Sequence, residues 1–247
     1  AVVEAAPPRA HLERLRERFG AEIETAGPVV RVRGEAELRP QRLAIPGDPS
    51  AAAFLAVAAL AVPGSEVRIE GVGANPRRTG LYRVLQEMGG DVAFENEREQ
   101  GGEPVADLVA RQSPLTGIEV PPETVPDMVD EFPALFVAAA FAAGETRARG
   151  LGELRLKESD RIAAMAAGLR AIGAAVEESE SGLVVRGSGG EPLAGGATIA
   201  ARGDHRVAMA FAVAGHHARR AIGVDDMACV RTSFPGFEVA LGGLAGA

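Results

Sequence analysis

Two short stretches of the sequence place cations and carboxylates directly before an apolar segment. Lys157–Arg161 precedes an amphipathic run, and Asp204–Arg206 precedes an alanine-rich one. The start of a helix exposes unpaired N–H groups and a partial positive charge, which attract anions. The planar guanidinium of arginine also binds a phosphate through two parallel hydrogen bonds. If Arg161 and Arg206 converge in the fold, the pattern predicts a phosphate-binding clamp.

Carboxylates near these cations could move protons. Glu158 stands beside Lys157 and could form an acid–base pair, since proton transfer needs a carboxyl group with a tuned pKa close to a counter-charge. Plainer interpretations remain open for each residue. Glu158 also fits a surface ion pair, Asp130 and Asp204 fit helix N-caps, and His205 fits a packed or capping histidine.

Metal and nucleotide chemistry find no support in the sequence. The pair His216-His217 is a poor metal motif because adjacent side chains do not converge, and the chain has one cysteine, Cys229. The glycine-rich stretches match neither a P-loop nor a dinucleotide fingerprint. We therefore expect no metal site, and nucleotide binding is unsupported.

Composition excludes several classes of protein. The 247 residues include 26 Lys and Arg against 34 Asp and Glu, a net charge of −8, and no Trp. This balance argues against nucleic-acid binding, which needs many cations or a stacking platform. No apolar run is long enough to cross a membrane, and no signal peptide is evident. A single cysteine favours a reducing cytoplasm, so we expect a cytoplasmic globular protein.

The same order of features recurs three times along the chain. Asp48, Asp130 and Asp204 each precede an alanine-rich apolar stretch, which is followed by glycine, a strand-like run, a polar turn and an amphipathic helix. The period exceeds that of solenoid repeats and fits whole α/β supersecondary units. The pattern predicts three βαβ-type units over Gly47–Ala247.

Periodicity and turn residues give the expected elements. We predict helices at Ala51–Val62, Leu81–Met88, Phe132–Ala143, Ile162–Ile172, Val207–Ala214 and Phe237–Leu244, and strands at Glu66–Val72, Asp91–Phe94, Thr146–Leu151, Ala175–Glu178 and Arg220–Val224. We expect Asn96–Glu103 and Gly187–Gly196 to be hairpins or surface loops.

The first 46 residues look like the second half of a further unit. A helix is predicted at Pro8–Phe19, followed by strands at Glu22–Thr25 and Val29–Val32. This order matches the end of each later unit without its beginning. We expect residues 1–46 to be the tail end of another domain and residues 47–247 to form one compact domain.

Several strings occur together and in order: Ile45–Ser50, Asn75–Gly80, Asp130–Pro133, Leu154–Arg161, Gly203–Met209 and Ser233–Phe237. This combination strongly resembles the 3-phosphoshikimate 1-carboxyvinyltransferase (EPSP synthase) family. The resemblance implies an α/β (α+β) enolpyruvyl transferase fold of three repeated βαβαββ units, packed with pseudo-threefold symmetry around buried parallel helices. It also implies a second, N-terminal domain, which this chain lacks apart from its last partial repeat, and an active site in the cleft between the domains.

The resemblance further implies transfer of the enolpyruvyl group of phosphoenolpyruvate to the 5-hydroxyl of shikimate 3-phosphate, without metal or cofactor. It assigns the binding of phosphoenolpyruvate to Arg161 and Arg206 and a candidate base to Asp130. It assigns proton transfer to Glu158 with Lys157, and a neighbouring site position to His205. Asp48 would reach a lysine of the missing domain, and Arg9 would bind the substrate phosphate, although Ala10 and Leu12 depart from the family pattern there.

Three other interpretations remain to be weighed. UDP-N-acetylglucosamine enolpyruvyl transferase shares the architecture, but Cys229 lies outside the cysteine loop expected there. A non-catalytic domain that binds phosphate ligands would need the arginines but neither Asp130 nor Glu158. An RNA-end-processing enzyme of similar fold is disfavoured by the acidic balance. We expect the chain alone to be inactive, because half of the cleft is absent.

Overall fold

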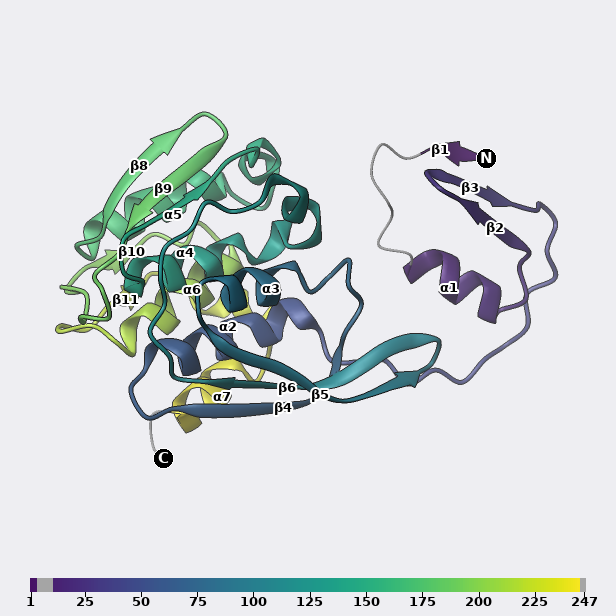
Figure 1. Ribbon diagram of the computed structural model, residues 1–247, viewed down its shortest axis with the longest axis horizontal. Coiled ribbons are helices and arrows are strands. Elements are labelled where there is room, and N and C mark those ends of the chain that lie inside the picture. Colours follow the sequence, from purple (N-terminus) through teal and green to yellow (C-terminus); the bar gives the residue numbers. More distant parts are fainter. Residues whose placement is uncertain (4–10, 245–247) are drawn as a thin grey trace.

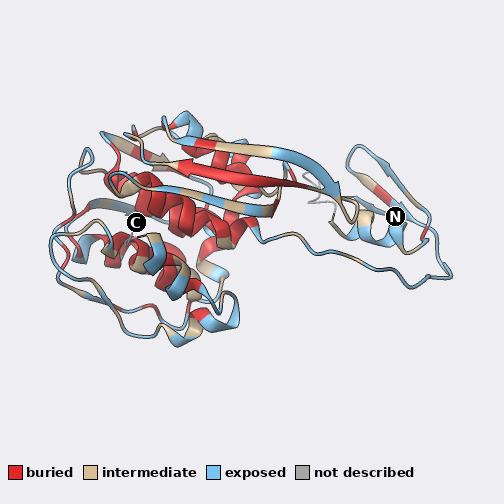
Figure 2. Cartoon of the chain, turned by 90° about the horizontal axis from the view of Figure 1, so that it is seen from below, coloured by how far each residue is buried: buried red, intermediate tan, exposed pale blue. Residues whose placement is uncertain are grey.

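Three almost entirely apolar helices occupy the centre of the fold. In the computed structural model, which describes residues 1–3 and 11–244, these are α2 (Pro49–Ala61), α4 (Phe132–Phe141) and α6 (His205–Gly215), and each contacts the other two. Helices that are apolar on every side are stable only when buried all round. Figure 2 shows them as the buried interior of the larger part of the molecule.

The first two units close with similar antiparallel sheets. In each, the strand after the central helix and the two last strands form one sheet, and the last strand of the unit lies in the middle. The first unit contains β4 (Glu66–Gly73), α3 (Gly80–Glu87), β5 (Asp91–Gln100) and β6 (Glu103–Arg111); the second contains β7 (Glu145–Ala148), α5 (Arg161–Ala171), β8 (Ala175–Ser179) and β9 (Gly182–Arg186).

The third unit repeats the first part of this arrangement. β10 (Thr198–Ile199) pairs in parallel with β11 (Gly223–Val224), and α7 (Phe237–Leu244) ends the described residues without a closing pair of strands. Isolated parallel bridges, Gly47 to Val72 and Glu119 to Arg147, mark the corresponding first strands of the other units. The triple repeat and the α/β class are confirmed.

Short 3₁₀ helices lie between the main elements. They are η1 (Pro122–Asp127), η2 (Val129–Glu131), η3 (Gly152–Leu156) and η4 (Ala228–Thr232).

The N-terminal elements lie to one side of the three units (Figure 1). The sheet β1–β3–β2 and helix α1 are joined to α2 by residues 33–46, which contain no helix or strand. These elements are β1 (Val2–Val3), α1 (His11–Arg18), β2 (Ile23–Ala26) and β3 (Val29–Val32). The expected helix at Pro8–Phe19 and both expected strands are found here, although residues 8–10 lie outside the described residues. Leu12 and Val32 remain exposed, so this sheet and helix bury little apolar surface of their own.

The β5–β6 hairpin is bent at a carboxylate in its central strand. Asp107 of β6 accepts hydrogen bonds from the Asn96 side-chain amide at 2.8 Å and from the backbone N–H of Gly71 at 3.0 Å. Pairing registers shift on both sides of it, between Ile69 and Val72 and between Glu95 and Arg98. Asp107 therefore fixes two adjacent irregularities, and these set the direction of the hairpin.

We expect Asp107 to make the stability of the protein sensitive to acid. The Asn96 amide and the Gly71 N–H lower the pKa of Asp107 from 3.8 to about 2. Its contribution to the free energy of unfolding is therefore complete above pH 3.8 and is lost as the pH falls through the lower value. In urea unfolding, Asp107→Asn should be less stable than the wild type at pH 5, and the difference should shrink in acid. A difference that is constant with pH would contradict this.

Helices α5 and α6 meet at a glycine. A Cβ added to Gly168 would lie 2.2 Å from Cζ of the fully buried Phe211 ring. We expect Gly168→Ala to lower the free energy of unfolding by about 1–2 kcal/mol, since overpacking outweighs the better helix propensity of alanine. Gly242→Ala in α7, which has open space around it, should instead be neutral or stabilising. Equal effects of the two substitutions would contradict this account.

None of the helices in residues 11–244 combines the length and the apolar character needed to traverse a lipid bilayer.

Candidate active site at the helix N-termini

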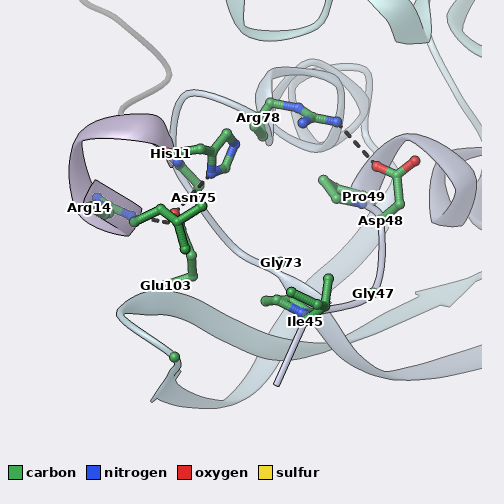
Figure 3. Close-up of a pocket in the computed structure, with 13 residues that line it drawn as sticks. His11, Arg14, Ile45, Gly47, Asp48, Pro49, Gly73, Asn75, Arg78 and Glu103 are labelled. Carbon is green, nitrogen blue, oxygen red and sulfur yellow. Dashed lines mark hydrogen bonds and ion pairs between the residues drawn. The ribbon is translucent and has the colours of Figure 1, made fainter. Parts of the chain in front are cut away.

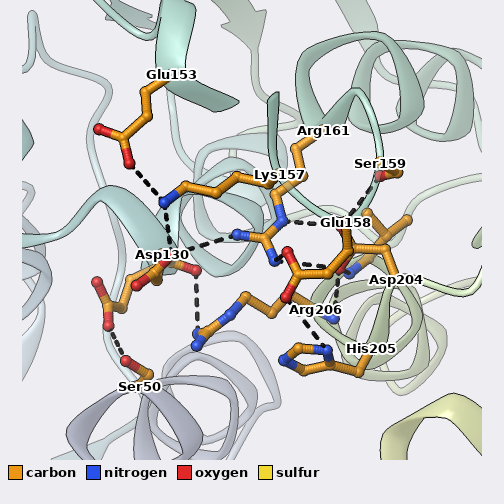
Figure 4. A network of polar contacts seen from close by, with 12 residues as sticks. Ser50, Asp130, Glu153, Lys157, Glu158, Ser159, Arg161, Asp204, His205 and Arg206 are labelled. Atoms are coloured by element: carbon orange, nitrogen blue, oxygen red, sulfur yellow. Dashed lines mark hydrogen bonds and ion pairs between the residues drawn. The ribbon is translucent and has the colours of Figure 1, made fainter. Parts of the chain in front are cut away.

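Arg161, the first residue of α5, is buried among carboxylates. Its side chain is only 1 % exposed, and its Nε donates to Oδ2 of Asp204 at 2.8 Å. Nη1 lies 3.4 Å from Oδ1 of Asp130, and Nη2 donates to Glu158. The guanidinium thus joins residues from three parts of the chain (Figure 4). The sequence predicted charge at this helix start but did not predict its burial.

Asp204 holds Arg161 and the start of α6 together. Its carboxylate is completely buried, accepts from the backbone N–H of Arg206 at 2.9 Å, and accepts from the hydroxyl of Ser159 at 3.0 Å. Burial alone raises the pKa of Asp204, but the hydrogen bond and charge of Arg161 outweigh it and leave the pKa below its ordinary value. The N-cap expected at Asp204 is therefore present, and the same side chain also binds the buried arginine.

Three cations surround Asp130. Lys157 Nζ lies 3.6 Å from its Oδ1, on the same carboxylate that Arg161 approaches. Arg206 donates from Nη1 to the main-chain carbonyl of Asp130 at 3.2 Å. In Figure 4 these side chains point toward Asp130 from separate elements. The side chains of Asp130 and Lys157 remain about one-fifth exposed, so the cluster is open to a ligand.

Glu158 and His205 lie at the exposed side of this cluster. The Glu158 side chain is 47 % exposed, and its Oε1 lies 3.9 Å from Nδ1 of His205. Burial and then the charge of Arg206 lower the pKa of His205, so the imidazole is neutral near neutral pH. Glu158 and His205 can therefore both exchange protons with a molecule bound at the cluster.

The structure brings together six of the predicted site residues, namely Asp130, Lys157, Glu158, Arg161, His205 and Arg206. Asp48 lies elsewhere, at the N-cap of α2, where Arg78 donates to it at 3.1 Å. Arg9 lies outside the described residues. In residues 1–3 and 11–244 there is no group of three or more His, Cys, Asp or Glu side chains arranged to hold a metal ion.

Residues 1–241 match the protein family described as EPSP synthase (3-phosphoshikimate 1-carboxyvinyltransferase). The chain belongs to the EPSP synthase family. It is 58 % identical over 248 residues to the 3-phosphoshikimate 1-carboxyvinyltransferase of Sphingopyxis alaskensis, and 54 % identical to that of Parvibaculum lavamentivorans. These alignments cover 98 % of this chain but 56 % and 55 % of the relatives. The chain thus spans about half the length of the curated relatives it matches.

Solved structures of the EPSP synthase family have the same fold. The structure of EPSP synthase from Acinetobacter baumannii matches with a TM-score of 0.93 and 42 % sequence identity, covering 98 % of this chain and 56 % of that one. The enolpyruvyl transferase NikO from Streptomyces tendae matches with a TM-score of 0.70 at 21 % identity, which shows a shared fold alone. The expected enolpyruvyl transferase fold is confirmed.

One buried carboxylate of this EPSP synthase family member was not among the predicted site residues. Glu131 is 2 % exposed and accepts a hydrogen bond from the hydroxyl of Ser50, which is itself completely buried. Burial raises the pKa of Glu131 above its ordinary value, although Ser50, Arg206 and Arg78 act in the opposite direction. The available signal was an acidic residue at the very start of an entirely apolar helix.

A cavity of about 340 Å³ is lined by residues of both the N-terminal elements and the first unit of this EPSP synthase family chain (Figure 3). Glu103, near the tip of the β5–β6 hairpin, lines this cavity. Its carboxylate lies 2.9 Å from Nδ1 of His11 and 2.8 Å from Nη1 of Arg14. Asp48 and Arg78 line the same cavity. The hairpin therefore contacts α1 beside a cavity that the N-cap of α2 also lines.

Proposed function

We propose that this chain supplies the C-terminal half of a 3-phosphoshikimate 1-carboxyvinyltransferase. That enzyme would transfer the enolpyruvyl group of phosphoenolpyruvate to the 5-hydroxyl of shikimate 3-phosphate and release phosphate. The observation that carries the proposal is the convergence of Lys157, Arg161 and Arg206 on Asp130 at one open face. Relatives more than half identical bear this enzyme's name, which favours it over UDP-N-acetylglucosamine as the acceptor.

The cations fit a substrate with both a phosphate and a carboxylate. Arg206 and Arg161 would hold phosphoenolpyruvate, because charge-assisted hydrogen bonds to such anions are strong and directional. Arg161 is now paired with Glu158, whose side chain is half exposed and can give way. Asp204 is fully buried against the other edge of the guanidinium and would keep it oriented when a ligand replaces Glu158. The orientation of Arg161 is thus fixed before substrate arrives.

The carboxylates fit the two proton transfers. In the addition step, the 5-hydroxyl oxygen would bond to C2 of the enol, its proton would pass to Asp130, and Glu158 would protonate C3. In the elimination step, a proton would return from C3 to Glu158 as the C2–O bond to phosphate breaks, and the proton held by Asp130 would leave with the phosphate. Lys157, next to Asp130, would stabilise the negative charge that develops on the departing phosphate. Neutral His205 would stay close to Glu158 as a neighbouring site residue.

The remaining parts of the proposal concern the missing half. Residues 1–46 would be the end of the N-terminal domain and residues 47–247 the C-terminal domain, with the absent domain as partner. Asp48 would reach a lysine of that domain on closure, and Arg9 would bind the phosphate of shikimate 3-phosphate. We propose that the enzyme needs no cofactor and works in the reducing cytoplasm.

The test is phosphate release from shikimate 3-phosphate and phosphoenolpyruvate. The chain should be assayed alone and fused behind the part of the Sphingopyxis alaskensis relative that precedes the matched region. Orientation by a complete cleft can supply about 7–11 kcal/mol of barrier reduction, so the chain alone should be inactive and the fusion active. An inactive but folded fusion, beside an active relative, would overturn the transferase proposal and favour a non-catalytic phosphate-binding domain.

A further inference from the structure

A line of hydrogen bonds, exposed at one end and buried at the other, joins the cavity beside the N-terminal elements to the arginine cluster. It begins at Asp48 on the cavity wall, where Arg78 Nη2 donates to Oδ1 at 3.1 Å. The same Nη2 donates to the hydroxyl of Ser50 at 2.8 Å. Ser50 in turn donates its hydroxyl hydrogen to Glu131. Consecutive contacts therefore share an atom, first Nη2 of Arg78 and then Oγ of Ser50.

Glu131 is the far end of this line and the neighbour of the site. It is the last residue of η2, next to Asp130, and its backbone N–H donates to the carbonyl of Met128 at 3.0 Å. Arg206 donates to the carbonyl oxygen of Asp130, which belongs to the peptide bond between Asp130 and Glu131. Any movement of Glu131 thus displaces both a carboxylate of the cluster and the group that holds Arg206.

Burying the Glu131 carboxylate costs free energy, so its presence at this position needs an explanation. Burying a carboxylate lowers stability unless hydrogen bonds or opposite charges compensate. Here the compensation comes from the Ser50 hydroxyl and from the charges of Arg206 and Arg78, all of which pull the pKa of Glu131 down against its burial. An apolar side chain would fill the space at lower cost, but it would connect neither Ser50 nor the arginines.

We propose that Glu131 is a positioning residue that fixes Asp130 and Arg206 by tying their turn to Ser50 at the start of α2. The inference rests on the proposed function, since it assigns Arg206 to phosphoenolpyruvate. The proposal also links the Asp48–Arg78 pair to the site. A shift of Arg78 would move Ser50, and Ser50 holds Glu131 beside Asp130.

The experiment compares variants of the active fusion enzyme described above. Glu131→Ala and Ser50→Ala remove the connection, whereas Glu131→Gln keeps an oxygen that can accept from Ser50. Asp127→Ala is the matched control, because Asp127 is equally buried, lies on the preceding 3₁₀ turn and pairs with Arg77 and Arg83. Steady-state kinetics for each substrate and the melting temperature are measured for every variant.

Glu131→Ala should raise the KM for phosphoenolpyruvate about tenfold, a loss equivalent to about 1.4 kcal/mol of binding, and leave the KM for shikimate 3-phosphate near the wild-type value. Ser50→Ala should raise the KM for phosphoenolpyruvate in the same way, and Glu131→Gln should keep it close to the wild-type value. Asp127→Ala should melt at a lower temperature without this selective change. If Glu131→Ala lowers the melting temperature but leaves both KM values unchanged, Glu131 is only structural and the proposal is overturned.

A second measurement separates this inference from the proposed function. Phosphoenolpyruvate is titrated into the full chain without its fused partner, and the side-chain N–H signals of its arginines are followed by NMR. Wild type and Glu131→Gln should show the same shift of the Arg206 signal, and Glu131→Ala should show a smaller shift at each concentration. Equal titrations would overturn the positioning role even if the fusion were inactive, whereas an inactive fusion with unequal titrations would overturn only the transferase.

Discussion

Asp130→Asn in the fusion enzyme should lower kcat by about 10²–10⁴-fold, the usual contribution of a well-placed general acid or base. Asparagine has nearly the same shape but cannot take the proton of the acceptor hydroxyl. It also removes the negative charge that Lys157 and Arg161 approach at 3.6 and 3.4 Å. Because those cations remain, the KM for phosphoenolpyruvate should change little or fall. Phosphate release at saturating substrate is the measurement.

Asp127→Asn provides the control for this prediction. Asp127 lies three residues upstream and is more deeply buried, but its partners are Arg77 and Arg83 rather than the cluster. Its substitution should affect stability and leave kcat within about threefold of the wild type, a barrier change below 1 kcal/mol. If Asp130→Asn also stayed within that range, Asp130 would not be the base, and Glu158 would be the next candidate.

Asp204→Ala should lower the free energy of unfolding by about 3–5 kcal/mol, because it leaves the charge of Arg161 buried without its main partner. The Arg161 side chain is 1 % exposed and has little room to reach water. The substitution also removes the N-cap of α6, whose loss alone costs about 1 kcal/mol. The effect should appear in urea unfolding of the full chain, with no need for activity.

Two further variants separate the two contributions of Asp204. Asp204→Asn keeps a capping oxygen but not the charge, so its stability should lie between those of wild type and alanine. Arg161→Met combined with Asp204→Ala should recover part of the loss, because the stranded charge is gone. A loss below about 1 kcal/mol for Asp204→Ala would mean that Asp130 and Glu158 alone satisfy Arg161.

Local sequence pattern determined the helices well and the strands less well. The predicted helix Ala51–Val62 is found as α2 (Pro49–Ala61), because a continuous apolar run bounded by Asp48 and Pro63 leaves little freedom. The strand predicted at Asp91–Phe94 continues to Gln100, since a polar hairpin exposed to solvent has no apolar alternation to mark it. The strand predicted at Arg220–Val224 is reduced to Gly223–Val224, where parallel pairing with β10 is short.

Most of the candidate site could be inferred from the family motifs, but its buried partners could not. Arg161 and Arg206 were expected to share a site, and the structure places both against Asp130. The contact between Asp204 and Arg161 depends on how α5 and α6 pack, because the two residues are 43 positions apart in the chain. The Ser50–Glu131 contact likewise spans 81 residues. Such pairs follow from tertiary structure, which a single sequence does not encode in any local pattern.

The central helices also bear on how the protein is made. α2 contacts both α4 and α6, and α6 begins at His205. During synthesis, the apolar sides of α2 and α4 must therefore wait for most of the chain to leave the ribosome before their last neighbour is available. Exposed apolar helices in a nascent chain are prone to aggregate and are bound by chaperones. Ribosome-stalled chains that end before residue 205 should thus bind chaperones more strongly than chains that include all of α6.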